Sequence, residues 1–165
     1  MGIAIPQSRL DALEAKITRA FDAQPIPVET VTHQCEDCER LSADFRSVAW
    51  PDLPEAVIEQ HSADLPLLSP AAFAYYLPAF LRFGLHDFNR DSRVLQFLVY
   101  NIAPSDDENP EWKRERFRYF TREQMDVLQE FLQLVVEQDE LRLFLGTLGE
   151  ERRRLETHWS ERWNG

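Results

Sequence analysis

The apolar residues of this chain recur mostly at intervals of three and four, the spacing that places side chains on one face of an α-helix. The clearest case covers residues 70–83, which are apolar almost all round and contain one charged side chain, Arg82. Helices without a polar face lie in the interior of a protein. The pattern therefore predicts a central core helix over this segment.

Local signals mark the ends and the middle of this helix. Ser69 is a good N-cap, because its hydroxyl accepts from a backbone N–H that the first turn leaves free. Pro70 suits the first helical position, which needs no N–H. Pro78 removes one backbone hydrogen bond and predicts a kink. Gly84 predicts the end of the helix, because glycine readily takes the left-handed conformation found there.

Helical spacing also marks segments on both sides of the central helix. The predicted helices cover residues 10–21, 38–48, 53–61, 93–102, 125–135, 141–148 and 152–163. Residues 93–102 would also suit a buried strand, but their spacing and the lack of evident partner strands favour a helix. Thr121 and Gln124 form a capping box at the start of one helix.

The turn signals agree with a helical fold. The chain has five glycines and no Asn-Gly or Asp-Gly hairpin signal. Residues 28–32 predict a short extended piece, too isolated to support a sheet. We therefore predict an all-α, single-domain bundle over residues 1–165, with six to eight helices around a buried, Pro-kinked central helix. Residues 103–111 predict a mobile acidic loop.

Net charge separates two parts of the chain and narrows the classes of partner. The total is −11; residues 1–111 carry 8 basic and 18 acidic side chains, whereas residues 112–165 carry 10 and 11. An acidic surface repels nucleic acid and anionic membranes and attracts basic proteins. We expect a basic protein partner and no nucleic acid. The alternative is that the charge only keeps the protein in solution.

No segment predicts export or membrane insertion. The N-terminus lacks a basic region followed by an apolar one, and no apolar run reaches the length of a transmembrane helix. Two cysteines three residues apart are too few for a disulfide framework and agree with a reducing compartment. These features predict a protein of the cytoplasm that does not bind membranes.

The most versatile chemistry lies in His33, Cys35 and Cys38. Imidazole and thiolate are the ligands that zinc prefers, and a two-residue gap lets both sulfurs reach one ion. The sequence therefore predicts a zinc site with these three ligands. A fourth ligand would come from His61, His86 or a carboxylate such as Asp37.

This zinc site would have either of two roles. It would be structural, or an open position on the metal would hold water for a hydrolytic enzyme with Glu36 or Asp37 as general base. Without a metal, Cys35 and Cys38 would be plain reduced thiols in the first turn of a helix. A redox role is the weaker interpretation, because acidic neighbours disfavour thiolate.

Several segments together resemble a family of small bacterial proteins of unknown function. They are His33-x-Cys35-x-x-Cys38, Trp50, the run from Leu67 to Leu81, and Phe120-Thr121-x-x-Gln124. The resemblance covers residues 28–160 and implies no activity. In size and acidity these proteins resemble the immunity and inhibitor proteins that bacteria use against protein toxins.

Two functional hypotheses follow. The first is an acidic binding protein of the immunity or inhibitor type, which recognises a basic toxin or effector and carries a structural zinc at His33, Cys35 and Cys38. The second is a zinc-dependent hydrolase that uses the same cluster. The absence of other catalytic motifs favours the first and argues against an enzyme.

Overall fold

The computed structural model describes residues 5–22, 24–86, 93–102 and 115–137. These residues form helices, connecting loops and one isolated β-bridge, so the all-α prediction is confirmed for this part of the chain. In chain order the helices are α1 (Gln7–Ala20), α2 (Glu36–Phe45), the 3₁₀-helix η1 (Trp50–Asp52), α3 (Glu55–Gln60), the 3₁₀-helix η2 (Ser62–Leu67), α4 (Pro70–His86), α5 (Arg93–Ile102) and α7 (Arg122–Glu137). A helical turn at residues 115–117 precedes α7.

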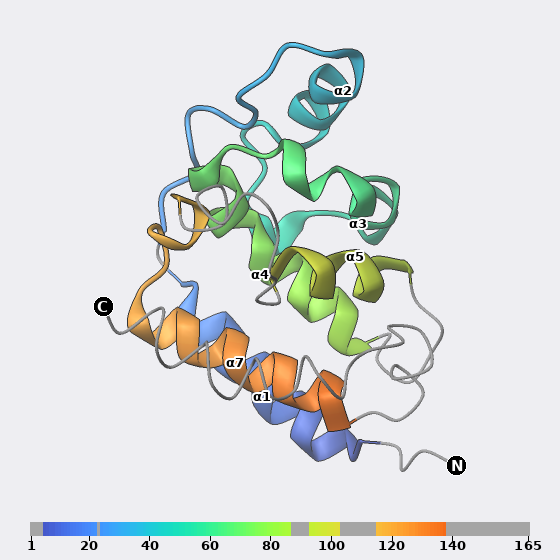
Figure 1. Ribbon diagram of the computed structural model, residues 1–165, viewed down its shortest axis with the longest axis vertical. Coiled ribbons are helices and arrows are strands. Elements are labelled where there is room, and N and C mark those ends of the chain that lie inside the picture. Colours follow the sequence, from blue (N-terminus) through green and yellow to red (C-terminus); the bar gives the residue numbers. More distant parts are fainter. Residues whose placement is uncertain (1–4, 23, 87–92, 103–114, 138–165) are drawn as a thin grey trace.

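Helix α4 lies in the middle of the molecule, with α1 and α7 along one side and α2 at the opposite end (Figure 1). It packs against α1, α3, α5 and both 3₁₀-helices. Twelve of its seventeen residues are buried. Its largest core side chains, Phe73, Tyr76 and Phe80, are almost inaccessible to solvent. The predicted central core helix is therefore confirmed.

The start of α4 is fixed by Ser69. Its Oγ accepts from the Ala72 N–H at 3.1 Å, which is the predicted N-cap bond. The same hydroxyl donates to the Glu29 carbonyl at 2.8 Å, and the Ser69 N–H donates to the Thr30 carbonyl at 2.9 Å. These bonds and the Val31–Leu68 bridge hold the short extended piece against the chain before α4.

Gly84 has a different role from the predicted one. Helix α4 continues past it to His86, so it does not end the helix. A Cβ at this position would lie 3.3 Å from Cδ2 of Leu98 and 3.4 Å from Cζ of Phe131. The glycine therefore lets α4 approach α5 and α7 closely. Helix α4 also runs through Pro78 without ending, and the kink stays a prediction.

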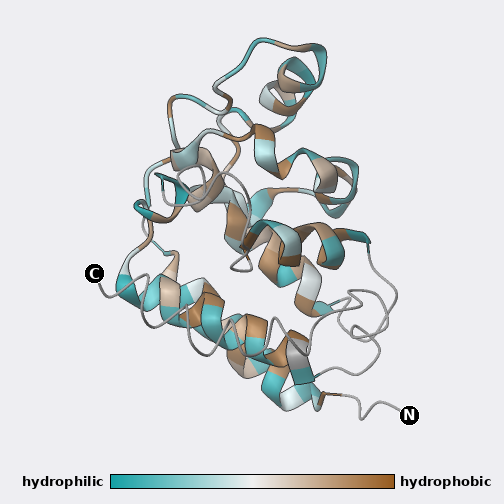
Figure 2. Cartoon of the chain, in the orientation of Figure 1, coloured by the Kyte–Doolittle hydropathy of each residue, from teal (hydrophilic) through white to brown (hydrophobic). Residues whose placement is uncertain are grey.

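Helices α1 and α7 form an amphipathic pair that covers one side of α4. Both show hydrophilic and hydrophobic positions around their axes (Figure 2). Leu13 and Ile17 of α1 and Leu128 and Phe131 of α7 are buried. The predicted capping box begins α7: the Gln124 N–H donates to Thr121 Oγ1 at 3.1 Å, and the Thr121 N–H donates to Gln124 Oε1 at 2.9 Å.

Three predicted segments, residues 103–111, 141–148 and 152–163, lie outside the described residues. Within the described ranges, no helix has both the length and the apolar character that crossing a lipid bilayer requires.

Candidate functional site at the start of α2

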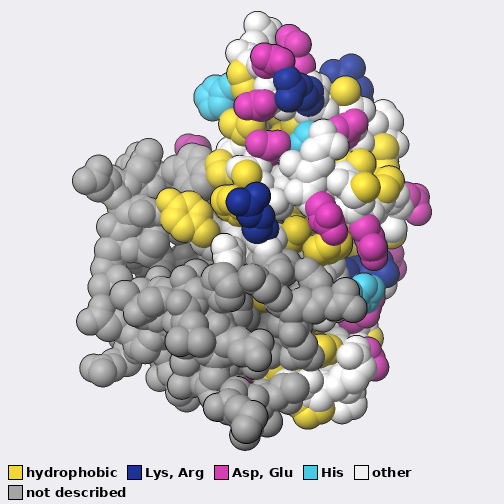
Figure 3. Space-filling view, turned by 90° about the vertical axis from the view of Figure 1, so that its right-hand side faces the viewer, with side chains coloured by type: hydrophobic (Ala, Val, Ile, Leu, Met, Phe, Trp, Pro, Cys, Tyr) yellow, Lys and Arg dark blue, Asp and Glu magenta, His cyan; other side chains and the backbone are white. Residues whose placement is uncertain are grey.

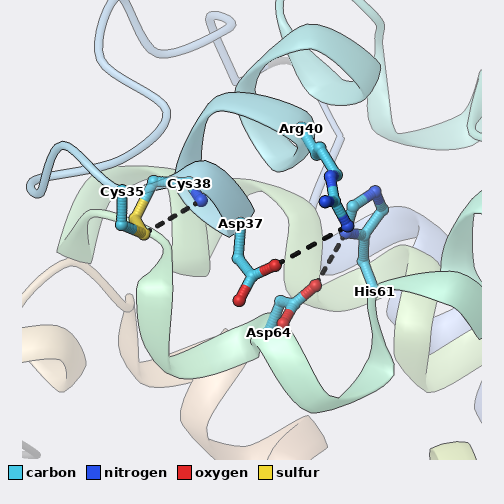
Figure 4. Close-up of a disulfide and its surroundings, with 6 residues drawn as sticks. All are labelled: Cys35, Asp37, Cys38, Arg40, His61 and Asp64. Carbon is cyan, nitrogen blue, oxygen red and sulfur yellow. Dashed lines mark hydrogen bonds and ion pairs between the residues drawn. A yellow bond between two sulfur atoms is a disulfide. The ribbon is translucent and has the colours of Figure 1, made fainter.

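Cys35 and Cys38 are joined by a disulfide across the first turn of α2, with their Cα atoms 5.0 Å apart (Figure 4). Cys35 is the N-cap residue, in an extended conformation, and its Sγ accepts from the Cys38 N–H at 3.1 Å. Cys35 is exposed, whereas Cys38 is only 1% exposed. The pair therefore presents one sulfur-bearing residue to solvent and keeps the other against the core.

The charges around this disulfide are mixed. Glu36, Asp37 and Glu39 occupy the first turn of α2, where the positive end of the helix dipole favours acidic side chains. Arg40, one turn later, forms an ion pair with Glu36, and its Nη1 atom lies 3.9 Å from Oδ1 of Asp37. The arginine offsets part of the negative charge beside the two sulfurs.

A groove with a volume of about 630 Å³ lies next to the disulfide. His33, Cys38, Ser42 and Arg46 are among the side chains that line it. Ser47, whose backbone has a φ of 62°, also lines the groove. The groove brings the predicted ligand His33 to the same region as Cys38, and both His33 and Arg46 are exposed.

His61 lies apart from this group and is bonded to two carboxylates. Its Nε2 is 2.7 Å from Oδ2 of Asp44 on α2, and its Nδ1 is 2.9 Å from Oδ2 of Asp64 on η2. The His61 side chain is 2% exposed. A neutral imidazole has one N–H, so two carboxylates are both satisfied only when the ring or one of the acids carries an additional proton.

The arrangement of these residues does not fit the predicted zinc site. Sulfur atoms joined in a disulfide are not thiolates and do not ligate zinc. Both ring nitrogens of His61 are occupied by Asp44 and Asp64, and Figure 4 shows the imidazole directed toward Asp64 and not toward the sulfurs. Among the described residues, no group of three or more His, Cys, Asp or Glu side chains is placed to hold a metal ion. A zinc site would require reduction of the disulfide and a rearrangement of the ligands.

The adjacent tyrosines Tyr75 and Tyr76 of α4 belong to the core. Tyr75 and Tyr76 are 5% and 1% exposed. The Tyr76 hydroxyl donates toward the Phe45 carbonyl, 2.6 Å away, and the Val48 carbonyl, 3.0 Å away. Burial raises the pKa of Tyr76 to about 12, and electrostatic repulsion between its ionised form and that of Tyr75 is the smaller cause. Tyr76 therefore ties α4 to the end of α2 and leaves no room for a ligand.

Sequence reasoning missed Arg116 as a core residue. Its guanidinium lies 4.5 Å from the centre of the Phe73 ring and donates to the Leu68 carbonyl at 3.3 Å. Burial lowers the pKa of Arg116 to about 10, which leaves it charged at neutral pH. An arginine beside Phe117 in a helical turn gives no signal that its charge will lie over a buried ring.

Comparison with known proteins gives one match. A family model described as a family of unknown function (DUF6714) matches residues 13–163. The chain belongs to this family. The match begins within α1 and includes every other described helix, so the DUF6714 region contains the disulfide, the groove and most of the core. No curated protein and no solved structure matches the chain.

Proposed function

We propose that this DUF6714 protein is an acidic binding module that recognises a basic protein partner. The observation that supports the proposal is the charge of residues 24–67, which include α2, η1, α3 and η2 and are called the acidic lobe below. The acidic lobe carries nine acidic side chains and two arginines, Arg40 and Arg46. Figure 3 shows acidic side chains at several places on the described part of one face.

The two arginines of the acidic lobe do not neutralise it. Arg40 pairs with Glu36 and Asp37, and Arg46 donates to Ser42 Oγ at 3.3 Å. Asp44 and Asp64 are bonded to His61, whereas the other five acidic side chains are exposed: Glu29, Glu39, Asp52, Glu55 and Glu59. A surface of one sign attracts partners of the other and accelerates their encounter. A basic toxin or effector is the class of partner that this charge suits, in the manner of an immunity or inhibitor protein.

The proposal includes a cytoplasmic location. Stable structural disulfides are rare in the cytosol, where the disulfides that form are mostly transient, catalytic or redox-sensing. A single Cys-x-x-Cys pair at an exposed helix start suits the cytosol better than the secretory route, where several disulfides usually form a structural framework. The zinc hydrolase remains the alternative, but the arrangement of Cys35, Cys38 and His61 does not favour it.

The test is capture of a partner with matched charge variants. The acidic-lobe variant carries Glu39→Gln, Glu55→Gln and Glu59→Gln, and the control carries Asp11→Asn, Glu115→Gln and Asp126→Asn. All six positions are exposed, and both variants change the net charge equally. We expect the immobilised wild-type protein and the control to retain the same basic protein from a lysate of the source organism. The acidic-lobe variant should lose most of it.

Salt separates this interaction from nonspecific capture. At about 1 M salt the Debye length falls to about 3 Å, so the association rate with the retained protein should fall steeply. If no basic protein is retained at low salt, or if both variants lose it equally, the acidic lobe is not a binding surface. Elemental analysis of the reduced and oxidised protein tests the alternative, because the hydrolase needs one zinc per chain that is lost in Cys35→Ser.

A further inference from the structure

We propose that the Cys35–Cys38 disulfide is a site of reversible thiol–disulfide exchange, at which a dithiol reductant attacks Cys35. The two cysteines differ in access: Cys35 is exposed at the N-cap of α2, while Cys38 is 1% exposed and packed toward the core. An incoming thiolate must reach a sulfur atom in order to displace the other one. The sulfur of Cys35 is therefore the point of attack, and the sulfur of Cys38 is the leaving group.

The exchange has two balanced steps. In the first, a thiolate of the dithiol forms a bond to Cys35 Sγ, the Cys35–Cys38 bond breaks, and Cys38 leaves as a thiolate. In the second step, the free thiolate of the dithiol attacks the dithiol sulfur that is bonded to Cys35. A disulfide forms within the reductant, and Cys35 leaves as a thiolate. Two electrons pass from the dithiol to the protein, and the two protons of the dithiol are available to the two cysteines.

The start of α2 stabilises both thiolates as they form. Cys35 Sγ already accepts from the Cys38 N–H at 3.1 Å, a bond that strengthens when the sulfur becomes negative. Cys38 lies within the first helical turn, at the positive end of the helix dipole. Glu36 and Asp37 oppose this effect, and their pairing with Arg40 reduces their opposition.

The disulfide is not needed to hold α2 in place. A bridge across two intervening residues closes a short loop and removes little entropy from the unfolded chain. Helix α2 is held instead by Leu41 and Phe45, which are 1% and 0% exposed, and by the bond from Tyr76 to the Phe45 carbonyl. The fold therefore tolerates both redox states, which a reversible site requires.

The experiment uses the full chain and two small probes. Oxidised protein is treated with dithiothreitol, and the reaction is stopped at intervals by alkylation and read by mass spectrometry. We expect complete reduction of the native protein at neutral pH, with an unchanged far-ultraviolet circular dichroism spectrum. A disulfide that is reduced only after denaturation, or cysteines that remain thiols in excess oxidised glutathione, would overturn the proposal.

Matched single variants test the direction of attack. Cys38→Ser retains the exposed cysteine, and Cys35→Ser retains the buried one. With oxidised glutathione, Cys38→Ser should form its mixed disulfide at least about tenfold faster than Cys35→Ser, because access to the sulfur limits the rate. Equal rates, or a faster Cys35→Ser, would refute attack at Cys35.

The wild-type protein provides the same information if either variant fails to fold. Partial reduction with glutathione followed by alkylation should place the glutathione adduct on Cys35 and the alkyl group on Cys38, and the reverse pattern refutes the assignment. These measurements use purified protein alone. They therefore succeed or fail independently of the proposed basic partner.

Discussion

The α1–α7 pair and the acidic lobe use charge in opposite ways. Residues 5–22 and 115–137 carry eight acidic and six basic side chains, and three ion pairs connect the two helices: Arg9–Glu137, Lys16–Glu130 and Arg19–Glu123. The acidic lobe carries nine acidic and two basic side chains, and its arginines bond within α2. Opposite charges facing across a helix pair favour one register, whereas unbalanced charge on a lobe is available to another molecule.

The helix pair gains little stability from these charges. All three ion pairs are close to half exposed or more, and exposed pairs contribute about 0 to 1 kcal/mol each. The hydrogen bond from Arg9 to Glu137 raises the pKa of the arginine, so Arg9 remains charged at neutral pH. Both regions depend on the core around α4 for their stability. The difference in charge between the two regions therefore bears on recognition more than on folding.

The largest expected effect tests whether the two regions share that core. Phe45 of α2 and Phe131 of α7 are both fully buried. Replacing either with alanine should lower the free energy of unfolding by about 3 to 5 kcal/mol, because each change leaves a cavity. Chemical denaturation followed by circular dichroism measures both. If Phe45→Ala gives a first, separate transition while Phe131→Ala does not, the acidic lobe unfolds independently of the helix pair.

High pH should weaken the link between α4 and the acidic lobe. An unfolded tyrosine loses its proton near pH 10, whereas Tyr76 keeps its proton until about pH 12. The folded-state pKa is raised, so this contribution is complete below about pH 10 and is lost as the pH rises to about 12. A shift of this size corresponds to about 2 to 3 kcal/mol.

The control for this effect is Tyr76→Phe. The difference in unfolding free energy between the wild-type protein and Tyr76→Phe should shrink between about pH 10 and pH 12, which also subtracts the titration of every other group, including Arg116. A difference that stays constant over this range would mean that Tyr76 ionises at its ordinary pKa in the folded protein.

A smaller effect should follow from removing His61, which connects α2 with η2 inside the acidic lobe. His61→Phe keeps an aromatic ring against Phe45, whose centre lies 5.5 Å from the imidazole centre, but removes both bonds to carboxylates. We expect a loss of about 1 to 3 kcal/mol, since Asp44 and Asp64 each lose their hydrogen bond to the imidazole. Thermal unfolding measures it.

A double-mutant cycle identifies the cause of this loss. Asp44→Asn should cost less in the His61→Phe background than in the wild-type protein, because its partner is already gone. Additive losses would show that His61 acts through packing and not through the Asp44 bond.

The smallest expected effect distinguishes the charges of the two regions directly. Glu130→Gln removes the partner of Lys16, whose Nζ lies 2.9 Å from Glu130 Oε2, and should lower stability by about 0.2 to 1 kcal/mol at low salt. Glu59→Gln in the acidic lobe should leave stability unchanged or raise it slightly, because it removes a repelling charge. Melting temperatures at low and high salt measure both. Equal losses would contradict the distinction between paired and surplus charge.

Much of the secondary structure was predictable because its signals are local. The Ser69 cap, the capping box of Thr121 and Gln124, and the apolar run of α4 all depend on residues within one or two helical turns. The same local reasoning failed at Gly84. Its function is decided by Leu98 and Phe131, which are distant in sequence and reach it only after the helices pack.

The candidate site was predictable in some of its members and not in its chemistry. The sequence predicted that Cys35 and Cys38 lie at the start of a helix, as they do, but it predicted zinc ligands or reduced thiols and not a disulfide. The spacing did not indicate that one cysteine would be exposed and the other buried, since exposure depends on which face of α2 packs against the core. Nor did it separate His61 from the pair, because Asp44 and Asp64 come from other elements.

The sequence by itself determined that the chain is helical, where most described helices lie, that α4 is central, and that the N-terminal part is acidic. Periodicity, capping residues and net charge are properties of neighbouring residues or of totals, so they survive without knowledge of the fold. Only the tertiary structure decided that α1 and α7 balance their charges across an interface while the acidic lobe does not. The partners in those ion pairs are more than one hundred residues apart, and the folding of the core brings them together.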